Sequence, residues 1–358
     1  MTTFHQVLVG AEPSDAIINI AIQSQAELRR LGPSEIFARV IEPAHASHVS
    51  ALQNLPLGRP TDALIYHSSV VDAEVTSALL RRPEQLVLVY HNASGTEFFV
   101  DNDPAASDGF ERRRQELAIL RDRVVLAVAD SKLNADDLIQ LGYDEVHLAA
   151  TGVRRRRLAD LPTDPETQIS LDEVVGAPFV LSVSELIPHN CQHVLVQAVH
   201  VLQTVHRAEL GLVMIGSSPD APYARALHRL VRGLRLRHTW ITGPQSNSSL
   251  ATIYRRAKLY SSASRYENLG IAEIEAMEFG IPTIVRDTGA RTQTIARGTL
   301  VLPSESGPLI FAEALLMAHE DDRLRSSLVD SGLALVSKFS ADGTQSLADV
   351  IEATGLAS

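Results

Sequence analysis

The chain has 358 residues, of which 45% are hydrophobic, and a formal net charge of −11. At roughly 150 residues per domain, this length predicts two domains, each with its own core. The acidic balance argues against a dedicated nucleic-acid binder, because phosphate neutralisation needs a basic surface. A single cysteine, Cys191, excludes an intramolecular disulfide framework and a cysteine-rich metal site.

The first residues, MTTFHQVLVG, lead directly into a strand-like run, with no basic segment followed by a long apolar stretch. We therefore expect no secretory signal. No uninterrupted apolar run reaches the roughly 18 residues that a membrane-spanning helix needs, so no transmembrane segment is expected either. These features predict a cytoplasmic protein.

Short apolar runs alternate with longer helical patterns in the first half of the chain. This alternation is typical of βαβ units and parallel sheets. A helical pattern covers residues 16–32, with Gly32 as the expected C-cap. The strands are predicted at residues 6–10, 63–67, 86–91, 124–130 and 145–150.

The second half repeats the alternation, with strands predicted at residues 179–184, 211–216, 238–243, 258–263, 282–287 and 298–303. The stretch between the halves is polar, contains proline and has no sustained period, which indicates an interdomain linker. The predicted fold class is α/β, with two Rossmann-like, doubly wound parallel-sheet domains facing a central cleft, where such sheets bind ligands. The predicted segments are a first domain over 1–153, a linker over 154–177, a second domain over 178–338, and a C-terminal helix over 339–358 that could return to the first domain.

One stretch of the second half has the composition of a ligand site: SRYENLGIAEIEAMEFGIP, residues 264–282. Gly270 permits a close approach of the backbone, and the helix predicted after it would point its first N–H groups at an anion such as a phosphate. Glu275 on that helix could accept hydrogen bonds from ribose hydroxyls, and Glu267 could accept them from a sugar. The alternative is a purely structural role, in which both carboxylates only interact favourably with the helix dipole.

The E-x7-E arrangement of Glu267 and Glu275, followed by AMEFGIPTIV and DTGA, resembles the donor-site motif of the family 4 retaining glycosyltransferases. Those enzymes have the GT-B fold of two Rossmann-like domains. Further stretches resemble the family in the expected order: FVLSVSELIPHNCQHVLVQAV at 179–199, then LVMIGSS and ITGPQSNSSLATIYRRAKLYSSAS. In the first half, SDAIINIAIQSQAELRRLGPSEIFA, DALIYHSS and VYHNASGTEFF resemble a bacterial subgroup.

The resemblance implies roles for individual residues. Glu275 would hold the ribose, and Glu267 together with His91 would be the catalytic pair that orients the donor sugar. Three more residues are expected on the acceptor side, in the first domain: Asp15, Asn19 and His67. The remaining donor-binding residues implied by the resemblance are Gly243 and Pro244 beside the base, and Asn268, Leu269, Gly270 and Ile271 near the sugar or phosphate.

The chain departs from the family pattern where two cations usually clamp the donor diphosphate. The aligned stretch VSELIPHNC has Glu185 in place of an arginine and Asn190 in place of a lysine. A carboxylate there would repel a diphosphate. Arg265, Arg286 and Arg291 are the cations that could replace the missing pair.

The sequence therefore predicts a retaining glycosyltransferase that moves a sugar from a nucleotide diphosphate donor to a glycan, envelope component or secondary metabolite. No cofactor is expected beyond the nucleotide-sugar co-substrate, and no metal, because the histidines of HNCQH at 189–193 are wrongly spaced for zinc. No particular oligomeric state is predicted. Two alternatives stay open: a catalytically degenerate pseudo-glycosyltransferase that acts as a binding or partner subunit, and an enzyme of the same fold that couples or epimerises a sugar nucleotide.

Overall fold

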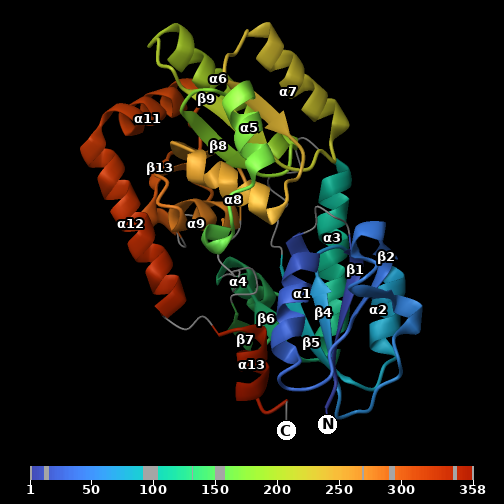
Figure 1. Ribbon diagram of the computed structural model, residues 1–358. Helices are drawn as coiled ribbons and strands as arrows, with labels where there is room; N and C mark the ends of the chain where they lie inside the picture. Colours follow the sequence, from blue (N-terminus) through green and yellow to red (C-terminus); the bar gives the residue numbers. More distant parts are fainter. Residues whose placement is uncertain are drawn as a thin grey trace. The chain divides into compact units, whose positions relative to one another are not determined.

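The structure is a computed structural model and describes residues 2–11, 16–91, 104–130, 132–149, 158–267, 270–289, 295–341 and 345–356. The chain divides into two compact units. Unit 1 comprises Met1–Arg155 with Gly343–Ser358, and unit 2 comprises Arg156–Asp342. Each unit contains one sheet with helices on both faces (Figure 1).

Unit 1 holds a sheet of seven strands in the order β3-β2-β1-β4-β5-β6-β7, and every strand pair described in it is parallel. The order reverses direction between β1 and β4, as in a doubly wound fold. The strands are β1 (Phe4–Ala11), β2 (Ile36–Ile41), β3 (Val49–Ala51), β4 (Ala63–Ser68), β5 (Gln85–Tyr90), β6 (Val124–Ala129) and β7 (Val146–Leu148).

Both faces of this sheet are buried, because side chains alternate along each strand and helices cover each side. One face packs on α1 (Ala16–Leu28) and on the C-terminal helix α13 (Leu347–Ala353), which contact each other. The other face packs on α2 (Ala73–Leu80), α3 (Pro104–Leu120) and α4 (Lys132–Gln140). Helix α13 therefore completes the core of unit 1 although it lies at the far end of the sequence.

Unit 2 repeats this plan with six parallel strands in the order β10-β9-β8-β11-β12-β13. The direction of winding reverses between β8 and β11. The strands are β8 (Phe179–Val183), β9 (Gly211–Ile215), β10 (Thr239–Thr242), β11 (Leu259–Ser262), β12 (Thr283–Arg286) and β13 (Leu300–Leu302).

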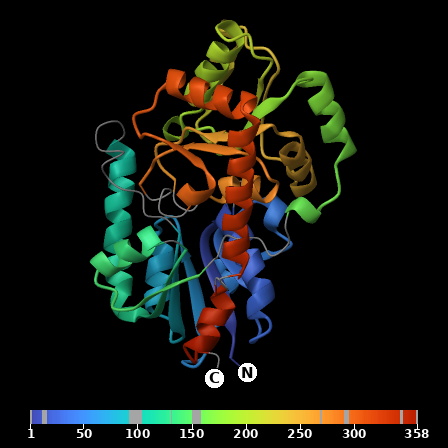
Figure 2. The same ribbon diagram turned by 90° about the vertical axis from the view of Figure 1, so that its left-hand side faces the viewer.

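The helices of unit 2 cover both faces of its sheet. One face packs on α6 (Gln192–Thr204), α7 (Ala221–Gly233) and α11 (Pro308–Glu320), and the other on α5 (Pro165–Val174), α8 (Asn247–Arg256) and α9 (Ile271–Glu278). The long helix α12 (Asp322–Ala341) packs on α9 and α11 (Figure 2). Two doubly wound parallel sheets confirm the predicted α/β fold class.

The predicted linker over 154–177 contains a helix, which the sequence analysis missed. Asp164 is the N-cap of α5 and accepts a 3.1 Å hydrogen bond from the backbone N–H of Thr167, with Pro165 at the first helical position. This Asp-Pro start is a strong helix signal. Leu171 is buried against the core of unit 2, so this segment is part of that unit.

Three further details differ from the prediction. Strands β2 and β3 were not predicted. Helix α1 ends at Leu28, and Gly32 is instead required because a Cβ there would lie 2.1 Å from the backbone oxygen of Thr2. Residues 339–358 do not form one helix: α12 ends at Ala341 in unit 2, whereas α13 begins at Leu347 in unit 1.

Within the described ranges, no helix combines the length and the apolar character needed to cross a membrane.

Candidate functional site

In open parallel sheets, ligands bind outside the carboxyl ends of the strands, where the winding reverses. In unit 2 this point lies between β8 and β11, so the loops that follow these two strands define the candidate site. The loop after β8 includes Glu185 and Asn190, and the loop after β11 includes Arg265 and Glu267.

The two loops are joined by Asn190. Its side-chain amide donates a 2.9 Å hydrogen bond to the backbone oxygen of Glu185, and its Oδ1 accepts one of 2.9 Å from Oγ of Ser264. The side chain of the buried Gln192 donates to the same Glu185 oxygen at 2.6 Å and to Oγ of Ser184 at 2.9 Å. The loop after β8 is therefore held by hydrogen bonds of its own amide side chains.

The Glu185 side chain is exposed at this edge of the sheet, and its Oε1 accepts a 3.0 Å hydrogen bond from Oγ of Ser217, which follows β9. The loops after β8 and β9 approach closely, since a Cβ on Gly216 would lie 1.9 Å from the backbone oxygen of Ser184. Only glycine fits there without a shift of the backbone. The Glu185 carboxylate thus lies at the switch point of unit 2.

His189, in this loop, and His193, just after it, supply no positive charge at pH 7. Burial lowers the pKa of His189 and of His193, and the nearby charges of Arg265 and Arg286 lower that of His193 further. Since an ordinary histidine pKa is about 6.5, both imidazoles are neutral at pH 7. His193 is instead a structural contact, with Nδ1 3.0 Å from the hydroxyl of Tyr223.

Three arginines were predicted as possible cations for a diphosphate, and two of them lie among the described residues. Arg265 is exposed, and its backbone N–H donates a 2.9 Å hydrogen bond to the oxygen of His189, which places it beside the loop after β8. Arg286 is buried; its guanidinium donates to the backbone oxygens of Ala263 and Ser304 and lies 5.4 Å from the centre of the Phe311 ring. Arg291 lies outside the described residues.

Helix α9 begins at Gly270, whose positive φ of 70° is the left-handed conformation that glycine adopts most easily. Ile271 is the first helical residue. Glu273 is buried in the first turn, and its Oε2 lies 3.1 Å from the position that a Cβ of Gly270 would occupy. Glu273 was not among the predicted site residues, although its carboxyl group lies at the helix start that was expected to meet a phosphate.

Glu275 lies in the next turn of α9 and is 8% exposed. Its Oε2 accepts a 3.1 Å hydrogen bond from the hydroxyl of Tyr254 on α8, and the same hydroxyl lies 3.1 Å from the backbone oxygen of Ala272. Tyr254 is fully buried, and burial followed by the Glu275 charge raises its pKa well above 10, so the phenol remains a donor. Glu275 is therefore a carboxyl group held in a fixed orientation.

The other predicted donor-side residues have less defined surroundings. Glu267 is half-buried, and its backbone oxygen accepts a 3.4 Å hydrogen bond from the Thr288 hydroxyl. Gly243 and Pro244 are exposed directly after β10. Asn268 and Leu269 lie outside the described residues.

In unit 1, a row of polar side chains crosses four neighbouring strands, from within β1 to the carboxyl ends of β4, β5 and β6. His67 on β4 lies between Gln6 on β1 and His91, which directly follows β5. The His67 ring has Nε2 2.8 Å from Oε1 of Gln6 and Nδ1 2.9 Å from Nε2 of His91. The row continues to Asp130 after β6, with Nδ1 of His91 3.4 Å from Oδ2 of Asp130.

The two histidines predicted in separate roles are thus in direct contact inside the protein. Their rings are nearly parallel, at 4°, and neither is more than 6% exposed. Of the other predicted acceptor-side residues, Asn19 is exposed on α1, and Asp15 lies outside the described residues. Gln6 and Asp130 were not predicted as site residues. Asp130 is the last residue of a predicted strand, and a polar residue at that position could have been proposed from the sequence.

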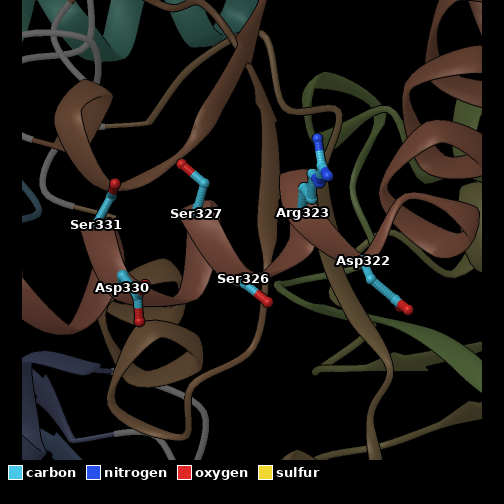
Figure 3. A pocket seen from close by; sticks show the side chains of 6 residues that line it. All are labelled: Asp322, Arg323, Ser326, Ser327, Asp330 and Ser331. Atoms are coloured by element: carbon cyan, nitrogen blue, oxygen red, sulfur yellow. The ribbon is translucent and has the colours of Figure 1, made fainter.

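An open hollow on unit 2 runs along α12 (Figure 3), and all the residues lining it come from that one helix: Asp322, Arg323, Ser326, Ser327, Asp330 and Ser331. A surface made by one helix brings no groups together from different elements, so we do not assign the site to it. Among the described residues, no cluster of histidine, cysteine and carboxylate side chains could hold a metal ion.

Known proteins resemble this chain in sequence and in fold. Residues 164–332 match the family model described as "Glycosyl transferases group 1". The mannosylfructose-phosphate synthase of Agrobacterium fabrum is 28% identical over 198 residues, which cover 52% of this chain and 43% of that protein. The D-inositol 3-phosphate glycosyltransferase of Jonesia denitrificans is 28% identical over 211 residues, covering 56% and 49%. The chain thus matches less than half the length of these two relatives.

Two solved structures of GT-B type cover nearly the whole chain. The Anabaena protein HepE in complex with UDP-glucose superposes with a TM-score of 0.73, at 17% identity and 99% coverage of both chains. A sucrose-phosphate synthase from Thermosynechococcus elongatus gives a TM-score of 0.74, at 16% identity, covering 99% of this chain and 98% of that one. The chain therefore has the GT-B fold, and its residues 164–332 form a domain that matches the group 1 glycosyl transferases.

Proposed function

We propose that the chain is a family 4 retaining glycosyltransferase, which acts in the cytoplasm and binds its nucleotide-sugar donor through unit 2. The observation that carries this proposal is the fixed orientation of Glu275. A buried carboxyl group held by Tyr254 on the helix after the switch point suits a pair of ribose hydroxyls. No cofactor beyond the nucleotide sugar would be needed.

In the proposed reaction, the bond between the sugar anomeric carbon and the diphosphate breaks, and a bond to an acceptor oxygen forms on the same face of the sugar. Positioning and stabilisation of the departing diphosphate would supply the catalysis. Arg265 is the described cation best placed to meet that charge, because its backbone is bonded to the loop after β8. Glu267 would orient the sugar, and the N–H groups of the first turn of α9 would lie near the donor.

UDP-sugars are the first donors to test, because the HepE protein of the same fold is described in complexes with UDP-glucose and with UDP and glucose. The curated relatives transfer or join sugars according to their names, and one is the alpha-D-kanosaminyltransferase of Streptomyces kanamyceticus, 28% identical over 236 residues. We propose a glycan or a small hydroxylated molecule as the acceptor.

A second function is favoured by one observation, the carboxylate of Glu185 at the switch point with Asn190 in place of a cation. A chain that lost the diphosphate clamp could keep the fold and act as a non-catalytic partner subunit. Such a pseudo-glycosyltransferase releases no diphosphate, so it would not need cations to stabilise one.

A turnover experiment distinguishes the glycosyltransferase from the non-catalytic partner subunit. The full chain is incubated with UDP-glucose and other nucleotide sugars, with a pool of acceptors, and release of the nucleoside diphosphate is followed with time. The anomeric configuration of the product is then read by NMR. Transfer with retention supports the proposed enzyme. Transfer with inversion would show a glycosyltransferase but contradict the retaining mechanism. Nucleotide binding without any turnover supports the partner subunit instead.

A further inference from the structure

In unit 1, the buried Gln6, His67 and His91 and the half-buried Asp130 form one row of polar side chains. Its order follows from the sheet. In the parallel register Gln6 pairs with Ile65, His67 with Val89, and Val89 with Val128. Since side chains alternate from face to face, all four polar residues point to the same face. His67 lies one step further along its strand than Gln6, and His91 one step further than His67, whereas Asp130 is level with His91.

Below the row, that face is apolar and packs on α1 and α13, through residues such as Ile65, Val89 and Val128. A polar group here must be hydrogen-bonded, because burial without a partner costs roughly 1 to 3 kcal/mol. The positions of the protons in the row are therefore fixed by the partners that each atom has.

The first member, Gln6, determines which atoms of the row donate hydrogen bonds and which accept them. Its side-chain Nε2 donates a 3.0 Å hydrogen bond to the backbone oxygen of Ala21 on α1. A carbonyl can only accept, so the amide cannot be flipped, and Oε1 of Gln6 faces His67 as an acceptor. His67 must then donate from Nε2.

The proton position on the second member, His67, determines the proton position on His91. Burial, followed by the charge of His91, lowers the pKa of His67 well below its ordinary value, so the ring is neutral and has one proton. With that proton on Nε2, Nδ1 of His67 is an acceptor and must accept a hydrogen bond from the Nε2–H of His91. The remaining nitrogen of His91, Nδ1, faces the Asp130 carboxylate, whose other oxygen accepts a 2.6 Å hydrogen bond from Asn134 on α4.

We propose that His67 is a positioning residue: it fixes the proton of His91 on Nε2, which leaves the Nδ1 edge beside Asp130 as the side through which His91 meets a substrate hydroxyl. In the ligand-free chain, Nδ1 of His91 lies 3.4 Å from Oδ2 of Asp130. Asp130 is 11% exposed at its side chain, whereas the His91 side chain is 1% exposed. The substrate part of this proposal rests on the proposed function, and the proton positions do not.

The proton positions are measured directly by long-range ¹H–¹⁵N NMR of the histidine rings in the full, ligand-free chain. The expected spectrum has His67 protonated on Nε2 and not on Nδ1, and His91 protonated on Nε2. In Asp130→Asn, His91 should keep its Nε2 proton, because that proton is set by His67 on the other side of the ring. A wild-type His67 ring protonated on Nδ1 would overturn the proposal, and this measurement needs no variant to fold.

Two variants of His67 separate positioning from packing. The side-chain oxygen of His67→Asn can take the place of Nδ1 and accept from His91, whereas His67→Gln reaches the place of Nε2 and can only renew the bond to Gln6. His67→Asn should keep the Nε2 proton of His91, and His67→Gln should lose it. If transfer is observed, kcat/KM should fall about tenfold in His67→Gln, the equivalent of one hydrogen bond, and much less in His67→Asn. Equal losses in the two variants would overturn the positioning role. A wild-type chain with no transfer would contradict the proposed function and leave the NMR result to decide the proton positions.

Discussion

The hydroxyl of Tyr254 on α8 donates a 3.1 Å hydrogen bond to Oε2 of Glu275 on α9. This contact joins two helices that cover the same face of the unit 2 sheet. It fixes a carboxyl group of the proposed donor site through a side chain that no solvent reaches. The same hydrogen bond therefore both orients the Glu275 carboxyl group and contributes to the stability of unit 2.

Tyr254→Phe removes this donor while keeping the ring, so it should weaken nucleotide binding about tenfold and lower the free energy of unfolding by about 1 to 2 kcal/mol. Calorimetric titration and urea unfolding measure the two effects. Tyr143→Phe is the matched control, because Tyr143 is a buried tyrosine of unit 1 whose hydroxyl donates to the backbone oxygen of Leu117 at 2.8 Å. Equal nucleotide affinity in the two variants would argue against a role for Tyr254 in the site.

Gly216 and Gly243 lie at equivalent ends of neighbouring strands but differ in the space around them. A Cβ on Gly216 would lie 1.9 Å from the Ser184 oxygen, whereas nothing lies within 4 Å of one on Gly243. Gly216→Ala should therefore destabilise unit 2 by about 2 to 3 kcal/mol, and Gly243→Ala should leave stability unchanged. Fluorescence of Trp240 on β10, the single tryptophan, follows the unfolding of this unit. Equal stabilities would show that the two loops can separate at little cost.

Glu185→Arg replaces the carboxylate at the switch point by the cation that the sequence resemblance leads us to expect there. If the diphosphate lies there, affinity for nucleoside diphosphates should rise about tenfold, or about 1.4 kcal/mol, and affinity for the nucleoside without phosphates should not change. Asn190 is left intact because its side chain joins the two loops. Glu209→Arg, at an exposed position before β9, is the control for the change in net charge. The same rise in both variants would place the phosphates elsewhere.

Stability of unit 1 should depend on pH through Asp62. Hydrogen bonds from the Arg59 side chain, together with the backbone N–H groups of Arg59 and Thr3, hold the pKa of this carboxyl group well below its usual range. The unfolded chain therefore binds a proton more readily than the folded one, and the stabilisation is present above about pH 4 and lost as the pH falls further. Urea unfolding followed by circular dichroism should show a steeper loss on acidification in the wild type than in Asp62→Asn. Parallel curves would contradict this assignment.

Much of the fold could be predicted because buried parallel strands are continuous apolar runs, such as residues 86–90 and 124–129. Strand β2 could not be found in this way. It lies one position from the edge of the sheet, and its last three residues, from Arg39 to Ile41, are not buried. Helix α5 was missed although Asp164 and Pro165 mark its start, because the stretch around it has few apolar residues.

The candidate site was predictable only where a motif is local in sequence. Glu267, Gly270 and Glu275 fall within one short stretch and were singled out from it. The contact of Tyr254 with Glu275, and that of His67 with His91, join residues 21 and 24 positions apart. Both depend on strand order and register, which no local pattern contains.

The central claim is that unit 2 binds a nucleoside diphosphate through Glu275. Isothermal titration of the full chain with UDP, GDP, ADP and the corresponding nucleosides tests it most directly, with Glu275→Gln as the variant and Glu320→Ala, an exposed glutamate of α11, as the control. We predict saturable binding of at least one diphosphate to the wild type and to Glu320→Ala. In Glu275→Gln this binding should fall at least about tenfold, with the folded state retained by thermal unfolding. No binding of any nucleotide to the folded wild-type chain, or equal binding to all three proteins, would contradict the claim.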